Sequence, residues 1–152
     1  MSMHLSPCHV LIAGVLAALL HSSALAARPA VPLARMAEVT SLAGLPAQIR
    51  ADLGVGETDA ISDRGGPFNP GCVMVPGRPN QRFMLAALGA DTAVVATEQG
   101  GIFHGASSRE YRYAKGKWTL VSTGMPGLDL AGQDDLLAQH ARSAQRVMVK
   151  RD

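Results

Sequence analysis

The chain has 152 residues, a formal net charge of +2 and 47% hydrophobic residues, a length that allows one domain with a single modest core. Its 14 basic residues are nearly balanced by 12 acidic ones. Because the densest basic stretch, 109–117, places its cations on alternate faces of a predicted strand, we expect no nucleic-acid binding.

The first 26 residues have the features of an export signal. An uncharged apolar run, Val10–Leu20, is followed by Ala24–Ala26, which has the A-x-A form of a cleavage site. The run is shorter than the ~18 residues expected of a membrane span. We therefore expect a signal peptide over 1–26 and one domain over 27–152, located in the periplasm or outside the cell and without a membrane span after cleavage. Since no Lys or Arg precedes the apolar run, an uncleaved N-terminal anchor is the alternative.

Cleavage would leave Cys72 as the single cysteine, which excludes a disulfide within the domain. Its neighbours Val73, Met74 and Val75 are apolar, and a free thiol in such surroundings usually behaves as a small hydrophobic group. The sequence therefore predicts a buried thiol in a short strand over Cys72–Val75.

Short helices are predicted near the start of the domain. Apolar residues recur at helical spacing at Leu42, Leu45, Ile49 and Leu53. Pro46 suits the first position of a helix and Gly54 the residue just past its end. We expect a helix over 46–53 and an earlier one around 34–40.

Residues 54–79 are rich in Gly and Pro, which predicts turns. Within this stretch, Asp63–Gly71 has consecutive glycines before a proline, and such a loop can present backbone N–H groups to an anion. Arg64 would add a positive charge, and Asn69 lies in the same loop, so both are candidate ligand-binding residues. The alternative is that Gly-Gly-Pro only forms a tight bend.

The centre of the chain, 82–123, is predicted to be an antiparallel meander of about four strands. Turn signals occur at Gly89–Thr92, at Gly100-Gly101 and at Lys115-Gly116. Because side chains alternate faces along a strand, each turn fixes a register. The turns pair Leu88 with Ala93, Gln99 with Ile102, and Ala114 with Lys117.

This register gathers nearly all the aromatic residues on one face of the predicted sheet. The face holds Phe83, Leu85, Ala87, Val94, Ala96, Phe103, Tyr111, Tyr113, Trp118 and Leu120. The opposite face is mixed in character and includes His104. We expect the first face to form the core.

Glu98 is the exception on the apolar face, where the register places it between Phe83 and Phe103. A carboxylate there reaches water at the end of the sheet, is paired, or has its pKa raised by burial. Glu98 is therefore a candidate ligand-binding residue at the mouth of a cleft, together with His104 and Tyr111. The alternative is an edge position whose side chain simply reaches solvent.

The last predicted element is an amphipathic helix over 133–147. Asp134 and Asp135 lie in its first turn and Arg142 and Arg146 in its last turns, an arrangement that favours the helix dipole. His140 borders its apolar stripe, where a partly covered histidine is more typical than a ligand.

The sequence predicts an α+β fold with an antiparallel meander, short N-terminal helices and a C-terminal amphipathic helix. No catalytic, cofactor or metal-site spacing is found. We expect an exported non-enzymatic binding or accessory module, inhibitor-like in size, that recognises an envelope protein or a small ligand. One alternative is a small hydrolase or isomerase with Glu98 as general acid or base and His104 or Tyr111 assisting. Another is a structural or assembly subunit, including a homodimer, that pairs through the mixed sheet face.

Overall fold

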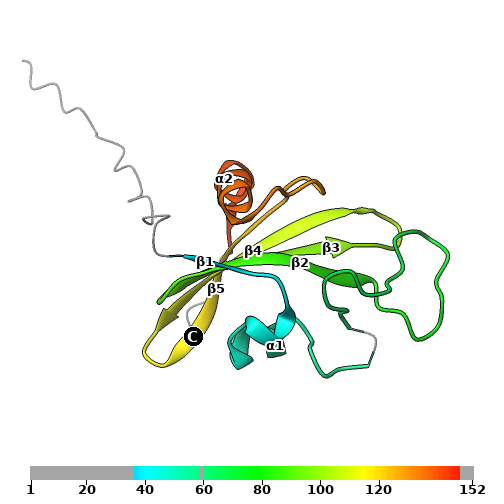
Figure 1. The fold of residues 1–152 in the computed structure, drawn as a ribbon, viewed down its shortest axis with the longest axis horizontal. Coiled ribbons are helices and arrows are strands. Elements are labelled where there is room, and N and C mark those ends of the chain that lie inside the picture. Colours follow the sequence, from blue (N-terminus) through cyan, green and yellow to red (C-terminus); the bar gives the residue numbers. More distant parts are fainter. Residues whose placement is uncertain (1–35, 59, 148–152) are drawn as a thin grey trace, which may run out of the picture.

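The computed structural model describes residues 36–58 and 60–147, which form an antiparallel meander of six strands in the order β1 to β6 with helices on both sides (Figure 1). The strands are β1 (Ala37–Val39), β2 (Gln81–Leu88), β3 (Thr92–Gln99), β4 (Gly105–Ala114), β5 (Lys117–Gly124) and β6 (Gln145–Arg146). The helices are a 3₁₀ turn (Leu42–Gly44), α1 (Ala47–Asp52) and α2 (Gln133–Ser143). No helix in these residues is long and apolar enough to cross a membrane. The predicted signal peptide, 1–26, lies outside them.

Each face of the sheet carries its own hydrophobic core. On the α1 side, Leu42, Leu45, Ile49 and Leu53 pack with Phe83, Ala86, Ala93, Val95 and Tyr111. On the α2 side, Leu136 packs with Leu85, Val94 and Ala96. The sheet is therefore buried on both faces, which explains why seven of the eight residues of β3 are buried.

The α+β class and the antiparallel sheet are confirmed, but the sheet has six strands rather than about four. The two additional strands are the short edge strands β1 and β6. The helix expected around 34–40 is wrong where the structure describes it, since Ala37–Val39 pairs with β2 instead. The helix over 46–53 is confirmed as α1, with Gly54 at a positive φ of 80° just beyond it. α2 ends at Ser143, earlier than expected, because the chain turns back into β6.

Two of the three predicted hairpin registers are confirmed. Leu88 pairs with Ala93, and Ala114 pairs with Lys117 across a turn in which Lys115 and Gly116 both have positive φ. The register at Gly100-Gly101 is wrong, because Gln99 pairs with Gly105 and residues 100–104 form a longer loop.

The predicted single aromatic face is therefore wrong as well. The long loop removes Phe103 from the sheet and leaves it exposed. A bulge between Phe83 and Leu85 turns these two residues to opposite faces. As a result Phe83, Tyr111 and Trp118 face α1, whereas Leu85 faces α2.

Trp118 tests this arrangement, because it pairs with Tyr113 as predicted but is only half-buried against the α1-side core. Its ring centroid lies 5.2 Å from that of Tyr113. We expect native fluorescence to the blue of free indole, shifting red on unfolding. Trp118→Ala should lower the free energy of unfolding by about 1–3 kcal/mol, less than for a fully buried ring, and Trp118→Phe should be milder. If the native emission matched that of free indole and Trp118→Ala left the free energy of unfolding unchanged, the packing of Trp118 against the α1-side core would be contradicted.

α2 is attached to the sheet by a buried polar cluster. His140 Nδ1 lies 2.8 Å from Ser108 Oγ on β4, and its Nε2 lies 3.0 Å from Ser122 Oγ on β5. The Ser122 hydroxyl donates a 2.6 Å hydrogen bond to Glu110, which also pairs with Arg112. His140 is thus a buried tie between α2 and two strands, rather than the partly covered helix histidine predicted from the stripe.

Gly124 makes the close approach of this cluster to the sheet feasible. A Cβ at Gly124 would lie 2.9 Å from Ser108 Oγ and 3.0 Å from His140 Nδ1. The cluster combines a serine, a histidine and a carboxylate, as hydrolases do, but Ser108, Ser122, Glu110 and His140 are all buried. It therefore serves packing, because a substrate has no access to the hydroxyls.

Neighbouring parts of the chain cover a portion of the sheet edge beside β2 and another beside β5. Beside β2, Ser62 forms a bridge with Arg82: its N–H donates to Gln81 O, and its carbonyl accepts from Phe83 N. Beside β5, the Gln48 side chain accepts from Trp118 N at 2.9 Å and donates to Gly116 O at 3.4 Å. These contacts satisfy edge groups that the short strands β1 and β6 leave open.

Candidate functional site

The most polar open site lies at the β3–β4 loop end of the sheet and is centred on Glu98. Arg82, its cross-strand partner, donates from Nε and Nη2 to Glu98 Oε2 at 3.0 and 2.6 Å. His104 Nε2 lies 2.8 Å from the other carboxylate oxygen, Oε1. Only 12% of the Glu98 side chain is exposed, whereas 44% of the His104 side chain is. Two cationic or potentially cationic groups thus hold one carboxylate.

The surrounding loops fix Arg82 in position. Its guanidinium carbon lies 4.2 Å from the centroid of the Phe68 ring, a cation–π contact. Its Nη1 donates to Gly66 O at 3.3 Å. The Phe68 ring also lies near the His104 ring, with the centroids 6.3 Å apart. The polar group is therefore rigid and already assembled without a ligand.

An open hollow of about 450 Å³ adjoins this cluster. It is lined by Arg64, Gly65, Arg82, Phe83, Met84, Leu85, Glu98, Leu128, Asp129 and Leu130. The lining thus combines leucine and methionine side chains with charged groups, an arrangement common in ligand sites. Two segments distant in sequence, the 64–66 turn and 128–130, meet here across β2 and β3.

Among the described residues that line this hollow, Arg64 is the cation without a partner. In the turn, its backbone N–H donates to Asp63 Oδ1 and that of Gly66 to Asp63 O, so neither N–H is left for an anion. Its guanidinium, by contrast, is exposed and makes no hydrogen bond or ion pair with residues 36–58 or 60–147. A ligand in the hollow would meet this cation next to the carboxylate of Asp129.

The surroundings of Glu98 favour its charged form at neutral pH. Burial alone would raise its pKa, but hydrogen bonds from His104 and Arg82, together with the Arg82 charge, hold the pKa of Glu98 below its ordinary value of 4.5. A general acid needs the opposite shift, towards the working pH. The arrangement therefore suits Glu98 to binding or positioning rather than to proton donation.

The lowered pKa of Glu98 predicts a stability that depends on pH. The paired carboxylate stabilises the fold fully above pH 4.5, and this contribution is lost as the pH falls through the lower pKa of the folded state. We expect wild type to be more stable than Glu98→Gln at neutral pH and the difference to shrink as the pH falls below 4.5. Urea unfolding of both proteins at a series of pH values measures this difference in the free energy of unfolding. A difference independent of pH would show that the ion pair contributes nothing.

The other two predicted site residues lie apart from this hollow. Asn69 is buried, donates to the carbonyls of Val75 and Arg78 and accepts from Val75 N, so it clamps the 69–80 loop. Tyr111 lies towards the other end of the sheet, where its hydroxyl donates a 2.6 Å hydrogen bond to Asp52. Burial and this hydrogen bond raise the pKa of Tyr111 well above 10. Glu98, His104 and Arg64 are thus brought to one end of the sheet, whereas Tyr111 is not.

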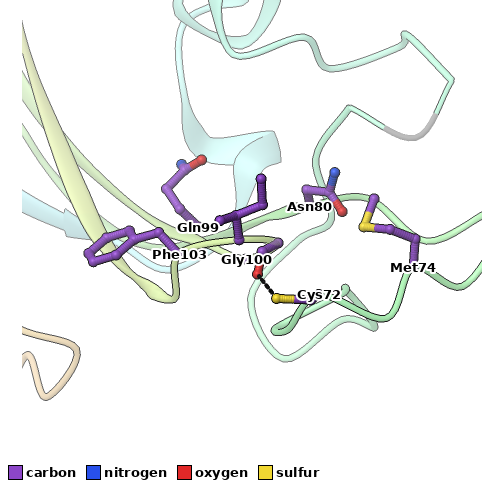
Figure 2. Close-up of a pocket in the computed structure, with 8 residues that line it drawn as sticks. Cys72, Met74, Asn80, Gln99, Gly100 and Phe103 are labelled. Atoms are coloured by element: carbon purple, nitrogen blue, oxygen red, sulfur yellow. Dashed lines mark hydrogen bonds between the residues drawn. The ribbon is translucent and has the colours of Figure 1, made fainter.

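A second hollow, of about 550 Å³, opens between the 69–80 and 100–104 loops, and Cys72 lines it (Figure 2). Phe103 lies on one side of it and Met74 on the other, with Asn80 and Gln99 between them. Cys72 is exposed and its Sγ lies 3.6 Å from Gly101 O. The predictions of a buried thiol and of a strand over 72–75 are both wrong, because this loop turns outwards instead of pairing.

Sequence reasoning missed Arg82 and Phe68 as parts of the site. The register from the turn at Gly89–Thr92 pairs Glu98 with Phe83, and only the bulge at Met84 brings Arg82 opposite Glu98. A shift of one residue in this register places Glu98 opposite Arg82, and the favourable charge pair could have indicated the bulge. Comparisons of the chain with protein-family models, with curated proteins and with solved structures gave no match, so a function has to be argued from this geometry.

Proposed function

We propose that the protein is an exported, non-enzymatic binding module whose ligand site is the hollow beside Glu98. The observation that carries the proposal is the Glu98 carboxylate, held between Arg82 and His104 at the edge of an open hollow. A polar group that is already fixed loses little conformational entropy when a ligand binds. The same pairing lowers the pKa of Glu98, which removes the general acid that catalysis would need.

The chemistry of the hollow indicates what it binds. Leu128, Leu130 and Met84 offer apolar contact, and the Arg64 guanidinium offers two parallel donors to a carboxylate or phosphate group. A small ligand or a partner side chain with an apolar body and an anionic end matches both features. Asp129 would select against a ligand with several negative charges.

A small hydrolase or isomerase is the second candidate, and one contact favours it. His104 Nε2 lies 2.8 Å from Glu98 Oε1 while almost half of the His104 side chain is exposed. A carboxylate that orients a solvent-accessible imidazole is a common arrangement for a general base. In this alternative His104 would accept the proton and Glu98 would only orient it.

Retention of partners from an envelope extract by the immobilised domain, 27–152, tests the proposal. The test variant is Arg64→Glu, which reverses the available charge at the hollow. The matched control is Arg142→Glu, which reverses an exposed arginine on α2. We expect Arg64→Glu to lower the amount of the specifically retained molecule about tenfold and Arg142→Glu to leave that amount unchanged.

The result also separates binding from catalysis. If retention is the same for both variants, the hollow beside Glu98 is not the ligand site. If the domain turns over ester or amide substrates and His104→Gln abolishes the turnover, the catalytic alternative replaces the proposal. In that case Glu98→Gln should lower the turnover through the orientation of His104.

A further inference from the structure

Large apolar side chains project into solvent from the two loops around the second hollow. We call this surface the apolar tip, and it consists of Cys72, Val73, Met74, Val75, Ile102 and Phe103. Ile102 is 99% exposed, Val73 is 84% and Phe103 is 59%. Soluble monomers rarely expose several such residues side by side, and patches of this kind usually mark interaction sites.

The apolar tip is held by a rigid frame. The buried Asn69 side chain clamps the 69–80 loop, and the Phe103 ring lies over Gly105, where a Cβ would approach it to 2.4 Å. The contact between Cys72 Sγ and Gly101 O joins the two loops (Figure 2). The exposure of these side chains is therefore imposed by the fold at the end of the sheet.

The two loops of the apolar tip contain no acidic residue, and Glu98, which precedes the second loop, is paired with Arg82 and His104. No Asp or Glu occurs over 64–90 or over 99–109, the stretches that contain both loops. Arg78 lies in the 69–80 loop, and its guanidinium makes no hydrogen bond or ion pair with another described residue. A partner that meets the tip thus meets apolar side chains next to a cation, which complements a surface that is apolar inside and anionic at its border.

We propose that the apolar tip docks on a membrane surface that contains anionic lipids. Ile102, Phe103 and Val73 would enter the boundary between headgroups and acyl chains, and Arg78 would contact lipid phosphates. A lipid surface deforms around separately projecting side chains, whereas a protein partner needs a matching cavity for each. A second copy of the chain is disfavoured, because a two-fold contact would bring the unpaired Arg78 side chains of the two copies together. This goes beyond ligand binding at the hollow beside Glu98 and does not depend on it.

Vesicle binding by the domain 27–152 tests the proposal. The vesicles are phosphatidylcholine alone or an equal mixture of phosphatidylcholine and phosphatidylglycerol, and bound protein is measured by sedimentation. In a separate sample an environment-sensitive dye on Cys72, the single thiol of this domain, reports whether the tip leaves water. We expect binding to the mixed vesicles, a blue shift of the dye, and weaker binding at high salt.

Matched variants locate the contact. Ile102→Ser and Phe103→Ser should each weaken binding to mixed vesicles about tenfold, since each removes a large apolar side chain. Arg78→Glu should weaken binding to mixed vesicles and leave any binding to phosphatidylcholine unchanged. The controls are Tyr113→Ser, an exposed aromatic residue at the opposite hairpin, and Arg142→Glu on α2. Both should bind as wild type does.

Three outcomes would overturn the proposal. They are no binding of wild type to either vesicle, equal loss in the tip and control variants, and a concentration-dependent dimer without vesicles that Phe103→Ser abolishes. The last would identify a second copy as the occupant of the tip. Arg64→Glu separates the two proposals, because loss of ligand retention there leaves the effects of Ile102→Ser and Phe103→Ser on vesicle binding untouched.

Discussion

Replacing His140 by alanine is expected to lower the free energy of unfolding by about 3–5 kcal/mol. The substitution removes a buried ring from between α2 and the sheet and leaves the Ser108 and Ser122 hydroxyls without their imidazole partner. A buried hydroxyl that loses its partner, as Ser108 does, costs about 1–3 kcal/mol, whereas Ser122 keeps its bond to Glu110; the cavity adds to this cost. Because the whole domain has only about 5–15 kcal/mol, the variant is expected to be partly unfolded at 37 °C.

Urea unfolding followed by circular dichroism measures this effect, and Arg142→Ala on the exposed side of the same helix is the control. The control should change stability by no more than about 0.5 kcal/mol. A His140→Ala variant as stable as the control would mean that water or neighbouring side chains replace every contact of the ring. The attachment of α2 would then rest on Leu136 and its apolar neighbours, together with the hydrogen bonds of Gln133, Gln139 and Ser143.

Gly100→Ala is expected to release the 69–80 loop from the end of the sheet. A Cβ at Gly100 would lie 1.7 Å from Asn69 O and 2.7 Å from Asn69 C, which are backbone atoms that cannot rotate away. The N–H of Gly100 also donates a 2.8 Å hydrogen bond to Asn80 O at the other end of the loop. We expect a loss of about 3 kcal/mol in the free energy of unfolding. Proteolysis within 69–80 should also become faster.

Gly71→Ala is the matched control, since a Cβ at that position meets no atom within 4 Å. It lies in the same loop and should leave both stability and cleavage rate near wild type. Equal cleavage rates for the two variants would contradict the proposed close contact. Vesicle binding by Gly100→Ala should also fall, because the apolar tip loses its frame without losing any of its side chains.

Local signals were sufficient where the chain makes tight turns. The turn at Lys115-Gly116 fixes the pairing of Tyr113 with Trp118, because a two-residue turn with positive φ at both positions leaves one register. At Gly100-Gly101 the same reasoning fails. Position 100 requires a glycine because the Asn69 backbone lies too close for a Cβ. Of the two glycines, only Gly101 has a positive φ. A glycine pair thus has two physical causes that a single sequence does not distinguish.

The site was predictable only in part for a related reason. Glu98 stands out in the sequence as a carboxylate within an apolar strand, and His104 follows it at a spacing that a short loop can close. The partner Arg82 depends on a bulge at Met84, which no turn residue marks. His140 on α2 is far in sequence from Ser108 and Glu110 on β4, and no local pattern relates the helix residue to the strand. The exposed Cys72 was predicted to be buried because apolar neighbours usually indicate a core.

The covered edges of the sheet restrict how the protein can meet a partner. Recognition by β-augmentation, in which a peptide adds a strand to an open sheet, needs a row of free backbone donors and acceptors. Ser62 occupies part of that row beside β2, and the Gln48 amide occupies part of it beside β5. These contacts also interrupt the template on which identical chains could stack into fibrils. A strand added beside β2 or β5 would have to displace these contacts, so at these two places a partner is recognised more easily through side chains and loops than through backbone pairing.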